Sequence, residues 1–365
     1  MRLLIATPLY PPELGGPATY SKILEEELPR KGIQTALVKF TDVKRYPAGI
    51  RTLLYFWTVL RAGKDADLIY ALDPVSTGLP ALIASKILRK PFAVKIVGDY
   101  AWEQGKQRFG ISTPLDIFVR ERQHAPIVRL FQRIQTRVAD DARAVIVPSE
   151  YLKGIVTRWG IDPDRIRVIH NAVTEEATGS LPQGLPKARP RVVTVGRLVP
   201  WKGIGGLIDA VATARASIPE ITLVIAGDGP DRAELESYAK ARLRDGYHFT
   251  GAVSNAEVLA LLASADMLVL NSSYEGLSHL LIEAMMAGTP TVATAVGGNS
   301  EVITDTVDGL LVPYGDRAKL AEAIVRVATE DGLAIKLHEA AKVSSARFTV
   351  KKMIESTART LTDLV

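Results

Sequence analysis

The chain has 365 residues, no cysteine and a formal net charge of +5. Its length predicts two domains, and the missing cysteine excludes disulfides, zinc sites with cysteine ligands and a thiol nucleophile. Residues 1–170 carry 26 Lys and Arg against 17 Asp and Glu, a net +9, whereas residues 171–365 carry 19 against 23, a net −4.

The basic first half favours an anionic partner, either an anionic lipid or a phosphorylated substrate, over the alternative of a plain solvated surface. It contains no basic run interleaved with aromatic residues and no nucleic-acid-binding motif, so we expect no nucleic-acid partner.

No apolar run approaches the roughly 18 residues that span a bilayer. The N-terminal stretch MRLLIATPLYPP has the pattern of a first strand and not of a signal peptide. We therefore expect a cytoplasmic protein.

Short runs rich in β-branched residues alternate with helical segments along both halves, which is typical of parallel α/β sheets. In the first half the predicted strands are residues 3–7, 34–39, 68–71, 92–97 and 144–148. In the second half they are residues 191–196, 222–227, 248–251, 267–271, 291–294 and 309–313.

The segment TEEATGSLPQGLPKARP, residues 174–190, is rich in Pro, Gly and charged residues, which predicts a linker. We expect one domain at residues 1–173 and a second at residues 191–345. Residues 346–365 follow all the strands and predict a C-terminal helix.

Two features of the first half predict contacts with ligands. Gly15 and Gly16 lie between the first strand and a predicted helix at residues 17–31, an arrangement that favours anion binding, although it is not the G-x-G-x-x-G dinucleotide motif. The segment GIRTLLYFWTVLRAGK, residues 49–64, is a predicted helix with one apolar face and nearby basic residues. This face either packs in the core or contacts anionic lipid; its residues are Ile50, Leu53, Leu54, Trp57 and Leu60.

Polar and glycine residues follow four strands of the second half at the point where each strand ends. In open parallel sheets ligands bind beyond these carboxyl ends, so we expect the residues to form one site. They are Gly196, Arg197 and Lys202 after the first strand, Gly227, Asp228 and Gly229 after the second, Val253 after the third, and Asn271 and Ser272 after the fourth, just before Glu275.

The charges of this predicted site suit a diphosphate without a metal ion. An arginine fork at Arg197 and a point charge at Lys202 can hold two neighbouring phosphates. A helix predicted to begin near Ser278 adds backbone N–H groups and the positive end of its dipole.

Glu275 and Glu283 are two carboxylates with different expected positions, one in the turn and one about one and a half turns into the helix. A carboxylate can accept hydrogen bonds from neighbouring hydroxyls, so we assign Glu283 to a ribose and Glu275 to a transferred sugar. The alternative is that Glu283 is an exposed helix residue and Glu275 a partner of the helix dipole.

The stretches VGRLVPWKG, IAGDGP, FTGAVS and NSSYEGLSHLLIEAMMAGTPTVATAVGGNSEVI, together with PPELGGPATY near the N-terminus, resemble the motifs of a large group of glycosyltransferases. This group is the retaining GT-B type of family 4, also called glycosyl transferases group 1. The resemblance covers nearly the whole chain. It implies two Rossmann-like domains facing a central cleft, with a C-terminal helix that crosses back to the first domain.

The resemblance also implies the substrates. A nucleotide-sugar donor would bind the second domain and an acceptor the first. We expect a UDP- or GDP-sugar as the donor, a glycan or lipid-linked compound as the acceptor, and a peripheral location at the inner face of the membrane. No metal or cofactor is implied. Val253 would contact the base, and Ser278, His279 and Leu280 would line the phosphate and sugar.

The sequence departs from the family pattern at two places. The usual Glu-Gly-Phe-Gly is replaced by Glu275-Gly276-Leu277-Ser278. The histidine that the family usually presents after the fourth strand is missing. Asp99 is the best substitute for orienting or deprotonating the acceptor, or for a hydrogen bond to the donor sugar. The alternative for Asp99 is a role as the cap of a turn.

Two other classes of function compete with glycosyl transfer. A sugar-nucleotide epimerase or hydrolase could share the fold, but it would require proton-abstracting side chains in both domains. A catalytically silent nucleotide-sugar-binding protein would tend to lose Arg197, Lys202 or Glu283, and all three are present.

Overall fold

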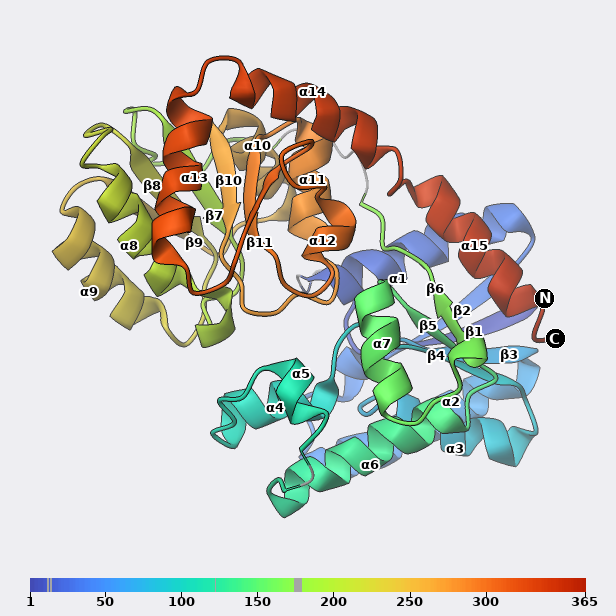
Figure 1. Cartoon of the computed structure of the whole chain (residues 1–365). Helices are drawn as coiled ribbons and strands as arrows, with labels where there is room; N and C mark the ends of the chain where they lie inside the picture. The colour runs from blue at the N-terminus through green and yellow to red at the C-terminus, as the bar shows by residue number, and fades with distance from the viewer. Residues whose placement is uncertain (12, 14, 122, 174–178) are drawn as a thin grey trace. The chain divides into compact units, whose positions relative to one another are not determined.

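A computed structural model describes residues 1–11, 13, 15–121, 123–173 and 179–365. The chain divides into two compact units, Met1–Ala172 together with Val350–Val365, and Val173–Thr349. Each unit contains one six-stranded sheet with helices packed around it (Figure 1). All strand pairs are parallel, so the predicted two-domain α/β fold is confirmed.

In the first unit the strand order is β2-β1-β3-β4-β5-β6. The strands are β1 (Arg2–Thr7), β2 (Gln34–Lys39), β3 (Leu68–Ala71), β4 (Phe92–Lys95), β5 (Ala144–Val147) and β6 (Ile166–Val168). The helices are α1 (Gly16–Glu27), α2 (Ala48–Ala62), α3 (Gly78–Leu88), α4 (Tyr100–Arg108), α5 (Leu115–Phe118), α6 (Pro126–Asp140), α7 (Glu150–Arg158) and α15 (Val350–Thr362).

Helix α15, drawn in red in Figure 1, returns to the first unit and completes its core. Its residues Met353, Ile354 and Leu361 are buried against Leu3 and Tyr20. The apolar face of this amphipathic helix therefore belongs to the core of the first unit, where α15 contacts α1.

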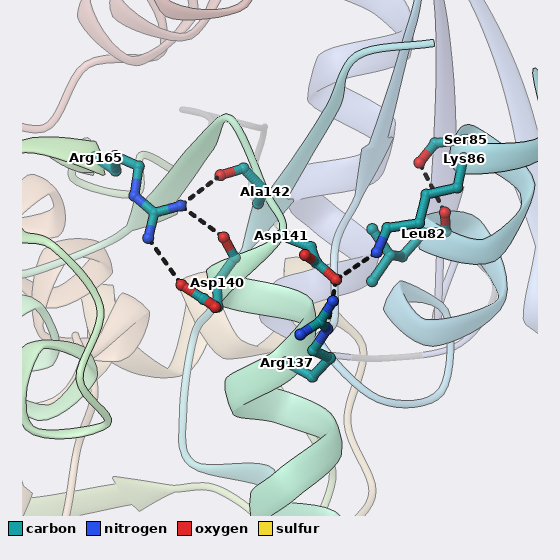
Figure 2. A network of polar contacts seen from close by, with 8 residues as sticks. All are labelled: Leu82, Ser85, Lys86, Arg137, Asp140, Asp141, Ala142 and Arg165. Carbon is teal, nitrogen blue, oxygen red and sulfur yellow. Dashed lines mark hydrogen bonds and ion pairs between the residues drawn. The ribbon is translucent and has the colours of Figure 1, made fainter. Parts of the chain in front are cut away.

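Helices α2, α3 and α6 of the first unit form one layer, in which α3 contacts both neighbours. Asp141, just after α6, joins α3 to α6 because its carboxylate lies 2.6 Å from Lys86 Nζ and 2.7 Å from Arg137 Nε (Figure 2). Burial alone would raise the pKa of Asp141, but its contacts with Lys86 and Arg137 hold that pKa below its usual value. Lys86 and Arg137 thus use their charges within the unit.

In the second unit the strand order is β12-β11-β10-β7-β8-β9. The strands are β7 (Arg191–Val195), β8 (Thr222–Ala226), β9 (Tyr247–Gly251), β10 (Met267–Leu270), β11 (Thr291–Thr294) and β12 (Leu310–Val312). The helices are α8 (Ile204–Ala214), α9 (Arg232–Leu243), α10 (Asn255–Ser264), α11 (His279–Ala287), α12 (Asn299–Val302), α13 (Arg317–Thr329) and α14 (Leu333–Ser345).

The central strands formed where predicted because they are buried on both faces. Every residue of β3, β4, β5, β10 and β11 is buried. A parallel sheet with helices on both faces requires such continuous apolar strands. Strand β6 was not predicted, since it has three residues, of which the central Arg167 is exposed.

The two compact units divide the chain at other residues than the predicted domain boundaries. Within the predicted linker, residues 179–190 belong to the second unit, where the backbone carbonyls of Pro186 and Ala188 accept hydrogen bonds from the side chains of Arg191 and Thr222. Residues 174–178 lie outside the described residues. The C-terminal helix begins at Val350 and not at residue 346, because Arg347 still donates a hydrogen bond to the carbonyl of Val302 in the second unit.

Candidate functional site

The loops that follow β7 and β8 are in direct backbone contact at the carboxyl edge of the second sheet. Gly227 has φ +133°, and a Cβ at this position would lie 2.0 Å from the carbonyl oxygen of Gly196. Only glycine allows this approach. The contact brings Arg197 close to Asp228 and Gly229, because Leu198 N donates a hydrogen bond to the carbonyl of Asp228 at 2.9 Å.

The loops after β10 and β11 are joined in the same way. Gly297 has φ +54°, and a Cβ there would lie 2.0 Å from the carbonyl oxygen of Glu275. Gly298 N donates a hydrogen bond to that carbonyl at 3.0 Å. The sequence analysis assigned no role to Gly297 and Gly298, although the GG pair was a visible signal of close backbone packing. The pair fixes the turn that carries Glu275.

Lys202 and Glu275 form an ion pair in which Nζ and Oε1 are 2.6 Å apart. Lys202 ends a short 3-10 helix, Pro200–Lys202, after β7. Glu275 lies in the turn after β10, and its Oε1 also accepts a hydrogen bond from Ser272 Oγ at 2.6 Å. The two residues that were assigned from the sequence to a diphosphate and to a sugar are therefore in contact.

Arg197 is exposed, and no ion pair of its guanidinium is found within the described ranges. It follows Gly196 at the end of β7, five residues before Lys202. The guanidinium of Arg197 and the ammonium of Lys202 lie at the same strand end. Because no carboxylate pairs with Arg197 within the described ranges, the two cations can bind an anion with two charges.

Helix α11 begins beside Glu275. Ser278 is its N-cap and accepts a hydrogen bond from Leu281 N, while His279 and Leu280 form the start of the first turn. An α-helix leaves its first N–H groups without intrahelical acceptors and carries a partial positive charge there. The start of α11 therefore supplies a third anion-binding element at this edge.

Glu283 lies further along α11 and is half-buried. Burial raises the pKa of its carboxyl to about 7. No hydrogen bond to this carboxyl is found within the described part of the chain. A carboxyl so placed gains stability from a ligand that brings hydroxyl groups to it.

The remaining predicted residues of the second unit have structural contacts as well. Asp228 accepts a hydrogen bond from Gly229 N at 2.7 Å and lies 3.4 Å from Arg232. Val253 is partly buried against the core and precedes Ser254, the N-cap of α10.

In the first unit, Gly15 is the N-cap of α1 with φ +133°, and Gly16 is the first helical residue. Their neighbours at positions 12 and 14 lie outside the described residues. Helix α1 contacts the end of β1 through Ser21 Oγ, which lies 2.6 Å from Thr7 Oγ1, and anion binding at this turn stays a prediction.

Asp99 has the capping role that the sequence analysis left as its alternative. It is the N-cap of α4 and is 1% exposed. Its Oδ1 accepts from Trp102 N at 2.9 Å, and its Oδ2 accepts from Trp159 Nε1 at 3.2 Å. Both carboxylate oxygens are used inside the unit, so this geometry does not favour a contact with the acceptor.

The apolar face of α2 is exposed, so the expectation that it packs in the core is wrong. Ile50, Leu53 and Trp57 are 53–57% exposed, whereas Tyr55 and Val59 on the opposite side are fully buried. Helix α2 has two apolar sides, and the larger residues of the predicted face point to solvent.

Two family models match the chain. The model described as glycosyl transferase 4-like domain matches residues 4–172, and the model of glycosyl transferases group 1 matches residues 181–344. The chain belongs to the glycosyl transferases group 1 family. The resemblance stated from the sequence is confirmed.

Several curated relatives of this family are bacterial. The chain is 30% identical to 2-deoxystreptamine glucosyltransferase of Streptomyces kanamyceticus over 66% of this chain and 64% of that protein. It is 29% identical to a GDP-mannose-dependent alpha-mannosyltransferase of Mycobacterium tuberculosis over 80% and 71%. The chain spans 38–64% of the length of the first four curated relatives that it matches.

Solved structures of the family share the fold. HepE of Anabaena, in complex with UDP and glucose, matches with a TM-score of 0.78 at 22% identity over the full length of both chains. Sucrose-phosphate synthase of Thermosynechococcus elongatus matches with a TM-score of 0.80 at 20% identity, over 100% of this chain and 98% of the other.

Proposed function

We propose that the protein is a retaining glycosyltransferase that moves a sugar from a nucleoside-diphosphate sugar to an acceptor without a metal ion. One observation carries the proposal: the Lys202–Glu275 ion pair, 2.6 Å long, lies beside the N-terminus of α11. This arrangement supports the binding of a diphosphate and of sugar hydroxyls at one edge of the sheet.

The cationic groups would stabilise the leaving diphosphate. Arg197, Lys202 and the first turn of α11 face the charge that grows when the bond between sugar and phosphate breaks. Lys202 has three N–H donors and uses one on Glu275, so two stay available for phosphate oxygens.

The two glutamates would bind the two ends of the donor. Glu283 accepts hydrogen bonds from the ribose hydroxyls, which relieves the cost of its burial. Glu275 accepts a hydrogen bond from a hydroxyl of the transferred sugar. The acceptor oxygen bonds to the anomeric carbon on the face from which the diphosphate leaves, as the bond between that carbon and the phosphate oxygen breaks. The leaving phosphate oxygen takes the proton of the acceptor hydroxyl, and attack from this face retains the configuration without a carboxylate nucleophile.

Two relatives narrow the class of donor. HepE of Anabaena was solved with UDP-glucose, and one mycobacterial relative is described as GDP-mannose-dependent. A UDP- or GDP-sugar is therefore the donor that we propose for this chain.

The exposed face of α2 supports a lipid-linked acceptor at an anionic membrane surface. Ile50, Leu53, Leu54 and Trp57 are 37–57% exposed, and Arg61 on the same helix makes no ion pair with the described residues. An apolar stripe next to basic residues is typical of helices that lie in a membrane interface. None of the helices in the described part of the chain has the length and apolarity needed to cross a membrane.

A thermal-shift experiment with a panel of UDP- and GDP-sugars tests the proposed donor. A ligand that binds only the folded state raises the melting temperature. We expect at least one nucleotide sugar to raise it, and the same sugar to have a smaller effect on Lys202→Ala. No shift with any member of the panel would contradict the proposal.

A further inference from the structure

Ser272 makes the contact that sets the orientation of the Glu275 carboxylate. It lies two residues after the end of β10 and is 0% exposed. Its Oγ donates to Glu275 Oε1 at 2.6 Å, and Lys202 Nζ donates to the same oxygen at 2.6 Å. The other oxygen, Oε2, accepts no hydrogen bond from the described residues.

The serine is itself held in place by a buried chain of hydrogen bonds. Thr294 Oγ1 donates to the carbonyl oxygen of Ser272 at 2.6 Å. Asn299 Nδ2 donates to the carbonyl of Thr294 at 3.0 Å. Thr294 and Asn299 are both 0% exposed, so the hydroxyl of Ser272 is attached to a rigid part of the unit.

The backbone of Glu275 is fixed separately, because its carbonyl accepts from Gly298 N at 3.0 Å. With the backbone held by Gly298 and one carboxylate oxygen held by Ser272, the remaining freedom of the side chain is small. Oε2 is then the acceptor that stays available to a ligand.

We infer that Ser272 is a positioning residue for sugar binding: its hydrogen bond to Oε1 of Glu275 directs Oε2 toward a hydroxyl of the transferred sugar. The inference rests on the proposed function of this site. Without the serine, the carboxylate can rotate and give both oxygens to Lys202. Glu275 would then lose its sugar contact, whereas the cationic groups would still bind the diphosphate.

The variant Ser272→Ala tests the inference, with Ser273→Ala as its matched control. Ser273 is the neighbouring serine, and its Oγ donates to the carbonyl of Trp201 and not to Glu275. Ser272→Thr keeps a hydroxyl and serves as the rescue variant. The probes are the nucleotide sugar that gives the largest thermal shift with the wild type and the corresponding nucleoside diphosphate.

We expect Ser272→Ala to lower kcat/KM for the nucleotide sugar by roughly 10- to 100-fold, the scale of one hydrogen bond to a charged group. Its Kd for the nucleoside diphosphate should stay within about twofold of the wild type. The variant should remain folded at the assay temperature, because only one buried hydrogen bond is lost. Ser273→Ala should behave as the wild type, and Ser272→Thr should recover a large part of the loss.

Three results would overturn the inference. One is wild-type kcat/KM in Ser272→Ala. The second is an equal loss of affinity for the diphosphate and the nucleotide sugar, which would show a general structural role. The third is a folded Ser272→Thr without any recovery. If no nucleotide sugar binds the wild type, the proposed function itself fails, and this outcome is separate from the other three.

Discussion

The ammonium of Lys202 and the carboxylate of Glu275 are 2.6 Å apart, although 73 residues of sequence separate them. Their side chains are 22% and 12% exposed. The pair joins the loop after β7 to the loop after β10. The cation that we propose for the diphosphate and the carboxylate that we propose for the sugar are therefore paired, and removing either one changes the surroundings of the other.

Arg197→Ala and Lys202→Ala should each lower turnover by on the order of 10²–10³-fold, the scale of one charge-stabilising donor. The variants should differ in stability, because Lys202 neutralises the half-buried Glu275 whereas Arg197 is exposed. Steady-state kinetics and melting temperatures check both points. Wild-type turnover should persist in excess EDTA, and strict dependence on a divalent ion would contradict the mechanism.

Glu275→Ala and Glu283→Ala should have different effects on binding. Glu283→Ala should weaken the nucleoside diphosphate and the nucleotide sugar alike, since both contain the ribose. Glu275→Ala should spare the nucleoside diphosphate and weaken only the nucleotide sugar. Calorimetry with both ligands measures the difference. If both variants respond alike to the two ligands, the assignment is wrong.

Nucleotide binding should also depend on pH through Glu283. Burial raises the pKa of this carboxyl to about 7, so in the empty site it is largely protonated below pH 7 and ionised above. Because the ribose hydroxyls donate to the ionised form, affinity should rise with pH through about 7 and level off roughly one pH unit above that pKa. Glu283→Gln, which cannot ionise, is the control, and it should remove this part of the profile. If the affinity of Glu283→Gln depends on pH as that of the wild type does, Glu283 does not cause the pH dependence.

Asp99→Ala should lower stability and leave transfer by the folded protein close to that of the wild type. The substitution removes the N-cap of α4 and the contact with Trp159, and loss of a cap costs about 1–2 kcal/mol. Melting temperature and turnover, measured well below the transition, separate the two effects. A large loss of turnover with unchanged stability would return Asp99 to the acceptor site.

Most of the fold could be predicted from the sequence because the central strands are buried on both faces and form continuous apolar runs. The candidate site in the second unit could be predicted from residues at the carboxyl ends of its strands, because a parallel sheet brings those ends together at one edge. The exposed side of α2 could not be predicted, since helical periodicity identifies an apolar face but not whether it is covered. In this helix Tyr55 and Val59 occupy the buried side.

The role of Ser272 and the cap at Asp99 also required the structure. Both depend on which of several nearby polar atoms a side chain reaches. Ser272 and Ser273 are identical in type and adjacent in sequence, yet only Ser272 contacts Glu275. Trp159, one partner of Asp99, lies 60 residues away along the chain, so no local pattern shows the pairing.

The double variant Leu53→Gln, Trp57→Gln should lose binding to anionic vesicles by roughly tenfold or more, because burial of two large apolar side chains is lost. Co-sedimentation of the wild type should be strong at low salt and fade as salt rises. Ile335→Gln is the matched control, since Ile335 is 66% exposed on α14 of the other unit. Equal binding to neutral and anionic vesicles would count against the proposed membrane contact.

Transfer of labelled sugar from a nucleotide sugar to a lipid extract, in the presence of EDTA, tests the central claim most directly. We expect labelled lipid to form in step with released nucleoside diphosphate, and both to fall on the order of 10²–10³-fold in Lys202→Ala. Two results would contradict a glycosyltransferase that acts on a lipid-linked acceptor. One is release of nucleotide at the same rate with and without extract, and the other is no release from any UDP- or GDP-sugar.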